Sequence, residues 1–387
     1  MITPAFNLTA TERVLPRLAL DFTTGVLDGR VTVTRALNTA TRVNSSGFIE
    51  GVNADLPRFD YDPVSIGVCK GLLIEETRTN LYTYTEDFMD PAIWFDNAGT
   101  VTRTGNATIA PNGLQEGDVL GFGGNASLGL YRSFSVTSGV EYTVSFWAKS
   151  ISGVTSGYRV TASTRLGGGN ITFTPTTSWQ RFTFTRTAAS SGATSPVFGV
   201  TDTATKELSI WGVQAEAGAF ATSYIPSVGA TSLTRNADVV VMTGTNFSSW
   251  YTSSSAALAA VVIPITATGT RPIWQLDDTT ANEIIALRGN VANPELYIVD
   301  GGVPQAQLDA GTITANTQYG LCAAFAANSC AVSQNGAAPV TTATATIPTV
   351  TQARIGSDGS NFLNGAVRTL RYWPQRVLNA ETQAFSK

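Results

Sequence analysis

The stretch that decides the fold is Tyr142-Thr143-Val144-Ser145-Phe146-Trp147-Ala148. Its residues alternate between the two faces of an extended chain, so a strand here places Tyr142, Val144 and Phe146 on one face. Residues 181–186 (RFTFTR) alternate in the same way, and residues 208–213 (LSIWGV) form a third apolar run. Short strands with one polar face are typical of antiparallel sheets that cover a core. The middle of the chain therefore predicts a β-sandwich or jelly roll.

The composition agrees with a β fold and excludes several classes of protein. The chain has 387 residues, only 13% of them charged, a net charge of -4 and no His. At roughly 100–200 residues per domain, this length predicts two or three domains. Without His there is no Ser-His-Asp triad, no Cys-His dyad and no His-ligated zinc. The negative net charge argues against nucleic-acid binding, and no apolar stretch is long enough for a membrane-spanning helix. We therefore expect a soluble all-β protein, without a secretion signal at its start, that is not an enzyme.

The three cysteines predict neither a disulfide framework nor a metal site. Cys69, Cys322 and Cys330 are too few and lack the spacing of metal ligands. Cys322 and Cys330 could form a bridge, but buried free thiols are the ordinary state of such residues.

The patterning divides the chain into an N-terminal segment and two antiparallel β-sandwich domains. Residues 1–78 contain few strand-like runs, which predicts a collar that docks on another domain or subunit. Residues 79–228 carry the alternating strands described above. Residues 229–237 form a linker that contains Ser, Thr and Gly, and residues 238–387 contain a second series of short apolar runs. We expect the second sandwich over that last range.

Several motifs together resemble those of bacteriophage virion surface proteins of the tail-fibre and head-spike-fibre type. They are PRFDYDP at residues 57–63, KGLLIEETRTNL at 70–81, WGVQAEAG at 211–218, TSYIP at 222–226 and RYWPQRVLNAE at 371–381. The resemblance implies a carbohydrate-binding-module-like jelly roll over residues 79–228. It implies a concanavalin- or laminin-G-like, lectin-like sandwich over residues 238–387. It also implies a protein that is made in the host cytoplasm and located on the virion surface, and it brings no matched catalytic motif.

Exposed aromatic rings are the natural candidates for glycan binding, because a flat ring covers the apolar face of a sugar. The alternation over residues 142–148 places Trp147 opposite the face of Tyr142 and Phe146, so Trp147 is the first candidate. The second is Trp250 with Tyr251, which lie among serines. A hydrophobic plug at the entrance of the sandwich is the alternative for this pair.

Carboxylates are the remaining groups with candidate chemistry. Jelly rolls of the type that this chain resembles often hold a structural calcium ion, for which Glu86, Asp87 and Glu216 are a possible set of oxygen ligands. Asp60 and Asp62 share a face if their segment is extended, as the pair of carboxylates in a glycosidase must. Capping or ion pairing is the ordinary role of such residues.

The sequence thus predicts a virion structural protein with lectin-like β-sandwiches that attaches to host-surface polysaccharide. We expect it to form homo-oligomers and to bind other virion proteins. A purely architectural decoration or connector protein without glycan binding is the first alternative. A polysaccharide depolymerase that uses two carboxylates is the second.

Overall fold

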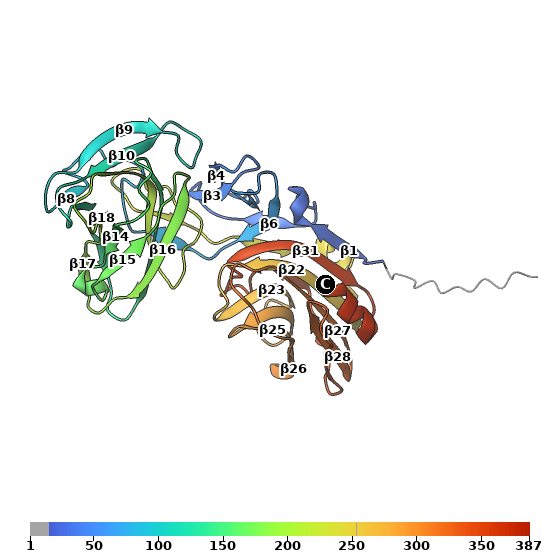
Figure 1. Ribbon diagram of the computed structural model, residues 1–387. Coiled ribbons are helices and arrows are strands. Elements are labelled where there is room, and N and C mark those ends of the chain that lie inside the picture. Colours follow the sequence, from blue (N-terminus) through green and yellow to red (C-terminus); the bar gives the residue numbers. More distant parts are fainter. Residues whose placement is uncertain (1–14, 253) are drawn as a thin grey trace, which may run out of the picture. The chain divides into compact units, whose positions relative to one another are not determined.

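The protein is built from antiparallel strands with very little helix, as the sequence predicts. Figure 1 shows the computed structural model, which describes residues 15–252 and 254–387. No helix within these residues is long and apolar enough to cross a membrane. The chain forms two compact units. Residues 33–239 make up one unit, and the described residues up to Thr32 make up the other together with residues 240–387.

The core of the unit 33–239 is a jelly roll of two five-stranded sheets. The first sheet has the order β16 (Gln180–Thr187), β13 (Glu141–Ser150), β19 (Lys206–Ala217), β10 (Gly117–Phe122) and β9 (Thr102–Thr108). The second has the order β15 (Asn170–Phe173), β14 (Tyr158–Thr161), β18 (Val197–Val200), β11 (Gly129–Tyr131) and β8 (Phe95–Asn97). A small pair of strands, β12 (Phe134–Val136) and β17 (Gly192–Thr194), and a 3₁₀ turn, η2 (Thr164–Leu166), accompany them.

The strand order confirms the predicted jelly roll. The chain passes from β10 to β11 and from β13 to β14, and in each case it changes sheet. The later strands β18 and β19 return between the earlier ones, which gives two interlocked Greek keys. Both sheets place their alternate apolar side chains in one core, to which β13 contributes Val144 and Phe146.

Shorter strands of this unit flank the jelly roll. Two of the pairs are hairpins, β3 (Ala40–Val43) with β4 (Ile49–Val52) and β5 (Phe59–Tyr61) with β6 (Cys69–Ile74). A third pair joins β7 (Arg78–Asn80) to β20 (Leu233–Arg235), which follows the jelly roll in the sequence. The strand β2 (Thr32–Thr34) begins at the division between the units.

A buried network of charges connects these flanking segments. Arg35 donates from Nη1 to Asp238 Oδ1 over 2.8 Å, and Arg58 also pairs with Asp238. Arg58 Nη1 lies 2.7 Å from Glu75 Oε2, and Arg235 Nη1 lies 3.0 Å from the same oxygen. All five side chains are at most 2% exposed, so each charge depends on its partners for stabilisation.

The other unit is a second antiparallel sandwich, also as predicted. One sheet has the order β29 (Val340–Thr342), β28 (Ser329–Gln334), β27 (Tyr319–Ala326), β22 (Ser255–Pro264) and β31 (Gly365–Trp373), and β1 (Leu18–Asp21) pairs with β31. The other has the order β21 (Val239–Met242), β30 (Gln352–Ile355), β23 (Thr270–Asp277), β24 (Ile284–Asn290), β25 (Asn293–Asp300) and β26 (Val303–Asp309). Three short helical elements complete the unit: η1 (Phe22–Thr24), α1 (Thr245–Ser248) and α2 (Asn379–Phe385). The ring of Phe385 in α2 stacks on Trp373, with centroids 4.5 Å apart.

Residues 1–78, predicted as one collar, are divided between the two units. Leu18 pairs with Tyr372 in the C-terminal sandwich, whereas Arg35, Arg58 and Glu75 belong to the charge network of the jelly-roll unit. Residues 1–14 of the predicted collar lie outside the described residues. The structure also corrects the predicted linker 229–237, because its residues Leu233–Arg235 form β20, which pairs with β7 in the jelly-roll unit.

Candidate functional site

The first sheet of the jelly roll has a second face, opposite the core, on which side chains form rows across β16, β13 and β19. The register places Arg181 beside Trp147, and Trp147 beside Trp211. In the next row, Lys149 lies beside Ser209 and its ammonium lies over the ring of Trp179, which directly precedes β16. Two rows at this end of the sheet therefore combine aromatic and cationic side chains.

The structure places Trp147 on this face, as the alternation predicts, while Tyr142, Val144 and Phe146 lie in the core. The register of β13 with β19 shifts between Ser145 and Trp147, because β19 has one extra residue between Gln214 and Trp211. Gly212 in the bulge has φ +61°, and a Cβ atom there would lie 3.0 Å from Trp147 Cε3. The role of Trp147 in glycan binding stays a prediction.

Trp147 is half-buried and rests on a floor of aromatic rings. Its ring centroid lies 5.6 Å from that of Trp211 and 5.7 Å from that of Tyr224, both edge to face. The floor rings are buried, at 1% and 2% exposure. The guanidinium of Arg181 lies 4.4 Å from the centroid of Trp147. These contacts hold the ring of Trp147 firmly. Both Trp147 and Arg181 remain partly exposed to solvent.

Trp179 provides a second half-buried ring beside Trp147. Its indole N–H donates to the carbonyl oxygen of Ile109 over 2.7 Å, which fixes the orientation of the ring. The Nζ atom of Lys149 lies 4.9 Å from the ring centroid. Both rings pack against the same small cluster, which contains Trp211 and Tyr224.

The two cations have no carboxylate partner among the described residues. Arg181 donates one hydrogen bond, from Nη2 to Ser145 Oγ over 2.9 Å, and its buried Nε has no acceptor. Partial burial lowers the pKa of both Arg181 and Lys149 from their ordinary values, because it disfavours a charged group. The cations are instead stabilised by the π faces of Trp147 and Trp179.

The predicted calcium ligands do not form a set. No three His, Cys, Asp or Glu residues within the described ranges are arranged to hold a metal ion. Glu216 is fully buried and accepts the backbone N–H of Thr222 over 3.0 Å, whereas Asp87 is exposed and accepts the N–H of Met89. Glu86 accepts a hydrogen bond of 2.8 Å from the hydroxyl of Tyr224. Each of the three carboxylates therefore has a local partner of its own, and the predicted site is wrong.

Glu86 is nonetheless unusual. Burial raises the pKa of its carboxyl group to about 7, and the nearby charge of Glu116 adds to the increase, while the bond from Tyr224 opposes it. Since the ring of Tyr224 supports Trp147 and Trp211, the titrating group is one hydrogen bond away from the aromatic floor.

Trp250 and Tyr251 are not an exposed platform, so that prediction is wrong. They are 1% and 9% exposed, and Trp250 packs edge to face on Tyr372 with centroids 4.9 Å apart. The short helix α1 turns both rings into the interior of the C-terminal sandwich, where Phe247 stacks on Tyr251. This is the hydrophobic plug that the sequence left as the alternative.

Asp60 and Asp62 both have structural roles. Asp60 accepts the backbone N–H of Val43 over 2.9 Å and pairs with Lys70. Asp62 accepts the N–H groups of Val64 and Ser65 in a tight turn, which lowers the pKa of its carboxyl group. The lowered pKa of Asp62 is opposite to the shift that a general acid needs.

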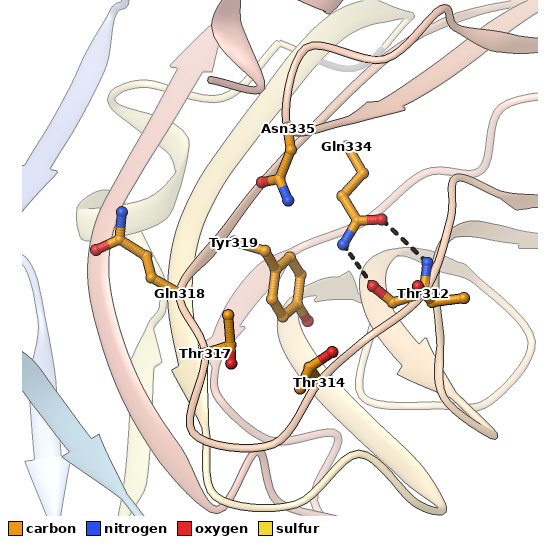
Figure 2. A pocket seen from close by; sticks show the side chains of 7 residues that line it. All are labelled: Thr312, Thr314, Thr317, Gln318, Tyr319, Gln334 and Asn335. Carbon is orange, nitrogen blue, oxygen red and sulfur yellow. Dashed lines mark hydrogen bonds between the residues drawn. The ribbon is translucent and has the colours of Figure 1, made fainter.

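The C-terminal sandwich contains an open polar pocket of about 250 Å³ between β27, β28 and the preceding loop. Figure 2 shows the residues that line it: Thr312, Thr314, Thr317, Gln318, Tyr319, Gln334 and Asn335. Gln334 bonds through both ends of its amide to the backbone of Thr312, at 2.8 and 3.1 Å. The side chains that could contact a ligand are uncharged, and most of them are exposed.

Sequence reasoning found Trp147 but missed its three companions. Trp179, Arg181 and Lys149 each lie at a position that alternation assigns to the same face as Trp147. Their proximity depends on the register between β13 and β16, which pairs residues more than 30 positions apart. Alignment of the two runs in antiparallel order, with Phe146 opposite Phe182, is the signal that could have found them.

Comparisons with known proteins add likenesses of low similarity. No protein family matches the sequence, and no curated protein matches it. Domain 4 of AbnA, a GH43 extracellular arabinanase from Geobacillus stearothermophilus, in complex with arabinotriose, is 14% identical with a TM-score of 0.31, covering 39% of this chain and 73% of that one. The CBM40 domain of the Ruminococcus gnavus IT-sialidase, bound to α2,3-sialyllactose, is 11% identical with a TM-score of 0.29, covering 35% of this chain and 84% of that one. Domains LG4-5 of the mouse laminin α1 chain are 8% identical with a TM-score of 0.24, covering 61% of this chain and 81% of that one. Similarities at this level carry no argument about function, and the jelly-roll fold rests on the strand order of the chain itself.

Proposed function

We propose that this protein is a structural component of a phage virion surface and attaches the particle to host polysaccharide through the end of the jelly-roll sheet that carries Trp147 and Trp179. The virion setting comes from the sequence motifs that resemble those of tail-fibre and head-spike-fibre proteins. The binding site comes from the geometry of the sheet.

The observation that carries the proposal is a pair of half-exposed Trp rings on the sheet face away from the core. The rings of Trp147 and Trp179 are held by Trp211, Tyr224 and the hydrogen bond to Ile109. Little conformational freedom is therefore lost when a ligand binds. Aromatic rings of this kind contact the C–H faces of sugars, while Arg181 and Lys149 supply donors for sugar oxygens. A preorganised aromatic surface with polar donors at its edge fits a saccharide better than an apolar partner.

The proposed attachment is non-covalent, and its strength comes from many copies. Two rings offer a small contact area, so a single site binds weakly. A homo-oligomer on a particle with many copies raises the effective concentration of the sites and converts weak binding into stable attachment.

The experiment that tests the proposal is binding of the labelled full-length chain to bacterial cells, with and without polysaccharide extracted from the same cells. Saturable binding that the polysaccharide competes away supports the proposal. Trp179→Ala is expected to weaken binding roughly three- to tenfold, because it removes one ring contact. Phe95→Ala is the matched control, since Phe95 is a 45% exposed ring on the opposite sheet.

Equal binding of the wild-type and Trp179→Ala proteins would exclude the site. Absence of binding to cells of every candidate host, combined with firm binding to the virion, would instead favour the architectural alternative. That alternative has one observation of its own. The connection between β5 and β6 exposes three apolar side chains, Val64, Ile66 and Val68, at 87%, 60% and 49%. Exposed apolar groups of this kind suit a contact with another virion protein.

A further inference from the structure

Arg181 and Lys149 lie outside the buried charge network of the jelly-roll unit. That network comprises the guanidinium groups of Arg35, Arg58 and Arg235 and the carboxylates of Glu75 and Asp238, and the buried Glu216 adjoins it through Thr222, which also bonds to Arg235. The nearby charges of Glu216 and Glu75 favour the charged form of Arg181, but Glu75 pairs with Arg58 and Arg235, and Glu216 bonds to Thr222.

Arg181 and Lys149 therefore present two positive charges without a paired carboxylate at the proposed site. Neither forms an ion pair within the described ranges, and the ammonium group of Lys149 donates no hydrogen bond there either. Both are held along the sheet by the rings beneath them. A half-buried cation without an anion is costly, and an anionic ligand removes that cost when it binds.

The four side chains lie at two alternate positions on each of two neighbouring strands. Trp147 and Lys149 lie on β13, and Arg181 and Trp179 lie at the start of β16 and directly before it. Neighbouring strands lie about 4.8 Å apart, and alternate residues of one strand lie about 6.7 Å apart. The two rings occupy one diagonal of this rectangle and the two cations occupy the other. A sugar that contacts either ring thus has a cation next to it.

We infer that the surface formed by Trp147, Lys149, Trp179 and Arg181 selects saccharides that carry a carboxylate, such as uronic or nonulosonic acids. This inference rests on the proposed function. The guanidinium group offers a planar pair of donors that matches a carboxylate, and the ammonium group adds a second charge. Rings beside cations distinguish this surface from a purely electrostatic patch, because a sugar ring has an apolar face and a sulfate or phosphate group has none.

The test measures binding of the full-length chain to four soluble polymers by calorimetry: polygalacturonate, polysialic acid, carboxyl-reduced polygalacturonan and dextran sulfate. The first two separate uronic from nonulosonic acids. We expect one or both to bind, and we expect the reduced polymer, which keeps the sugar backbone and lacks the charge, to bind at least tenfold more weakly. Dextran sulfate keeps a sugar backbone but carries tetrahedral sulfate esters in place of planar carboxylates, so it is expected to bind more weakly than the carboxylated polymers.

Matched variants separate the effect of the lost charge on binding from any effect of the substitution on folding. Arg181→Gln is expected to weaken binding of the carboxylated polymer about 10- to 100-fold, as loss of a charge-assisted hydrogen bond does. Arg181→Lys keeps the charge without the planar pair of donors and should recover only part of that loss. Arg186→Gln is the control, because Arg186 is an exposed cation of β16 outside the two rows. Melting temperatures of all variants show whether each is folded.

The outcomes separate the two levels of the proposal. Equal binding of polygalacturonate and its reduced form, with loss of both on Trp179→Ala, would keep the glycan site and overturn the preference for carboxylates. Equal binding of dextran sulfate, unaffected by Trp179→Ala, would show a general polyanion surface and also overturn it. Binding to none of the four polymers would count against both the preference and the proposed function.

Discussion

Asp238 provides the sharpest test of how the jelly-roll unit is held together. Its carboxylate accepts hydrogen bonds from Arg35 Nη1 at 2.8 Å, from two nitrogens of Arg58, and from the backbone N–H of Glu75 at 3.0 Å. The substitution Asp238→Asn keeps the shape but removes the charge. It also turns an N–H₂ group toward donors, so at least one donor is left without an acceptor. The substitution thus leaves one more buried positive charge in the network without a compensating carboxylate.

Removal of one member of a buried ion pair costs about 3–5 kcal/mol, since the remaining charge stays desolvated. In a unit of about 200 residues, each kcal/mol lowers the melting temperature by roughly 2–4 °C, so we expect a decrease of about 6–20 °C. Scanning calorimetry of the full chain measures it, and the transition of the jelly-roll unit should move. Glu50→Gln is the control in the same unit, because Arg42 and Glu50 form a pair that is 28% and 37% exposed. Such a pair contributes at most about 1 kcal/mol.

The loss of stability at acid pH (the acid limb of the stability curve) gives a second test of the same network. Burial alone would raise the pKa of Glu75, but the charges of Arg235 and Arg58 and the hydrogen bonds from Ser223 outweigh it and hold the pKa at about 2. A carboxylate whose pKa is lowered by folding stabilises the folded state above its ordinary pKa of 4.5. That contribution is lost as the pH falls from about 4.5 toward 2. If Asp238→Asn melted within 2 °C of wild type, or if the acid limb were unchanged, the network would not hold the unit together and this reasoning would be refuted.

Three further predictions concern single side chains. Folding raises the pKa of Glu86 to about 7, so the folded state loses stability as the pH rises from about 4.5 through 7. The substitution Glu86→Gln should flatten this dependence in melting curves measured between pH 5 and 8. An unchanged slope would contradict the prediction. Gly212→Ala should cost about 1–3 kcal/mol in chemical unfolding and weaken glycan binding, because the new methyl group meets Trp147 at a strained φ, whereas wild-type stability would show that the bulge adapts. Burial raises the pKa of the Cys322 thiol, so it should react with a thiol reagent only on unfolding, and rapid labelling of the native protein would disprove its burial.

The alternation over residues 142–148 was sufficient to predict the strand, its core face and the opposite position of Trp147. Such local patterns depend only on neighbouring residues, and they survive in the fold because the strand is long enough to span the sheet. The prediction that Cys322 and Cys330 are buried free thiols rather than a disulfide is confirmed.

Features that depend on distant residues could not be predicted in this way. Arg58 and Asp238 are 180 positions apart, and nothing in either segment indicates the other. The burial of Trp250 follows from one turn of helix at α1, which is too short to give a helical pattern in the sequence. The calcium set failed for a similar reason, because Tyr224 and Thr222 meet Glu86 and Glu216 only after the chain leaves β19 and folds back over the sheet.

That return of the chain also sets the size of the proposed binding site. The same sheet face continues from Trp147 to Ser145 and Thr143 and, on β19, to Gln214 and Glu216, all of which are buried. The segment after β19 covers them: Gln214 bonds to the backbone of Ile225, and Glu216 bonds to Thr222. Beyond the ring of Tyr224, the two rows that contain Trp147 and Trp179 keep partly exposed side chains. A site of two rows spans about 8 Å along its diagonal, enough for one or two sugar residues.

One copy of the protein should then bind short and long oligosaccharides with similar weak affinity. An oligomer should strongly prefer long saccharides, because only these connect several sites. Comparison of a disaccharide with the intact polymer, on monomeric and oligomeric protein, measures this difference. A steady gain in affinity with ligand length on the monomer would mean that the covering segment moves aside and that the whole face of the sheet is the site.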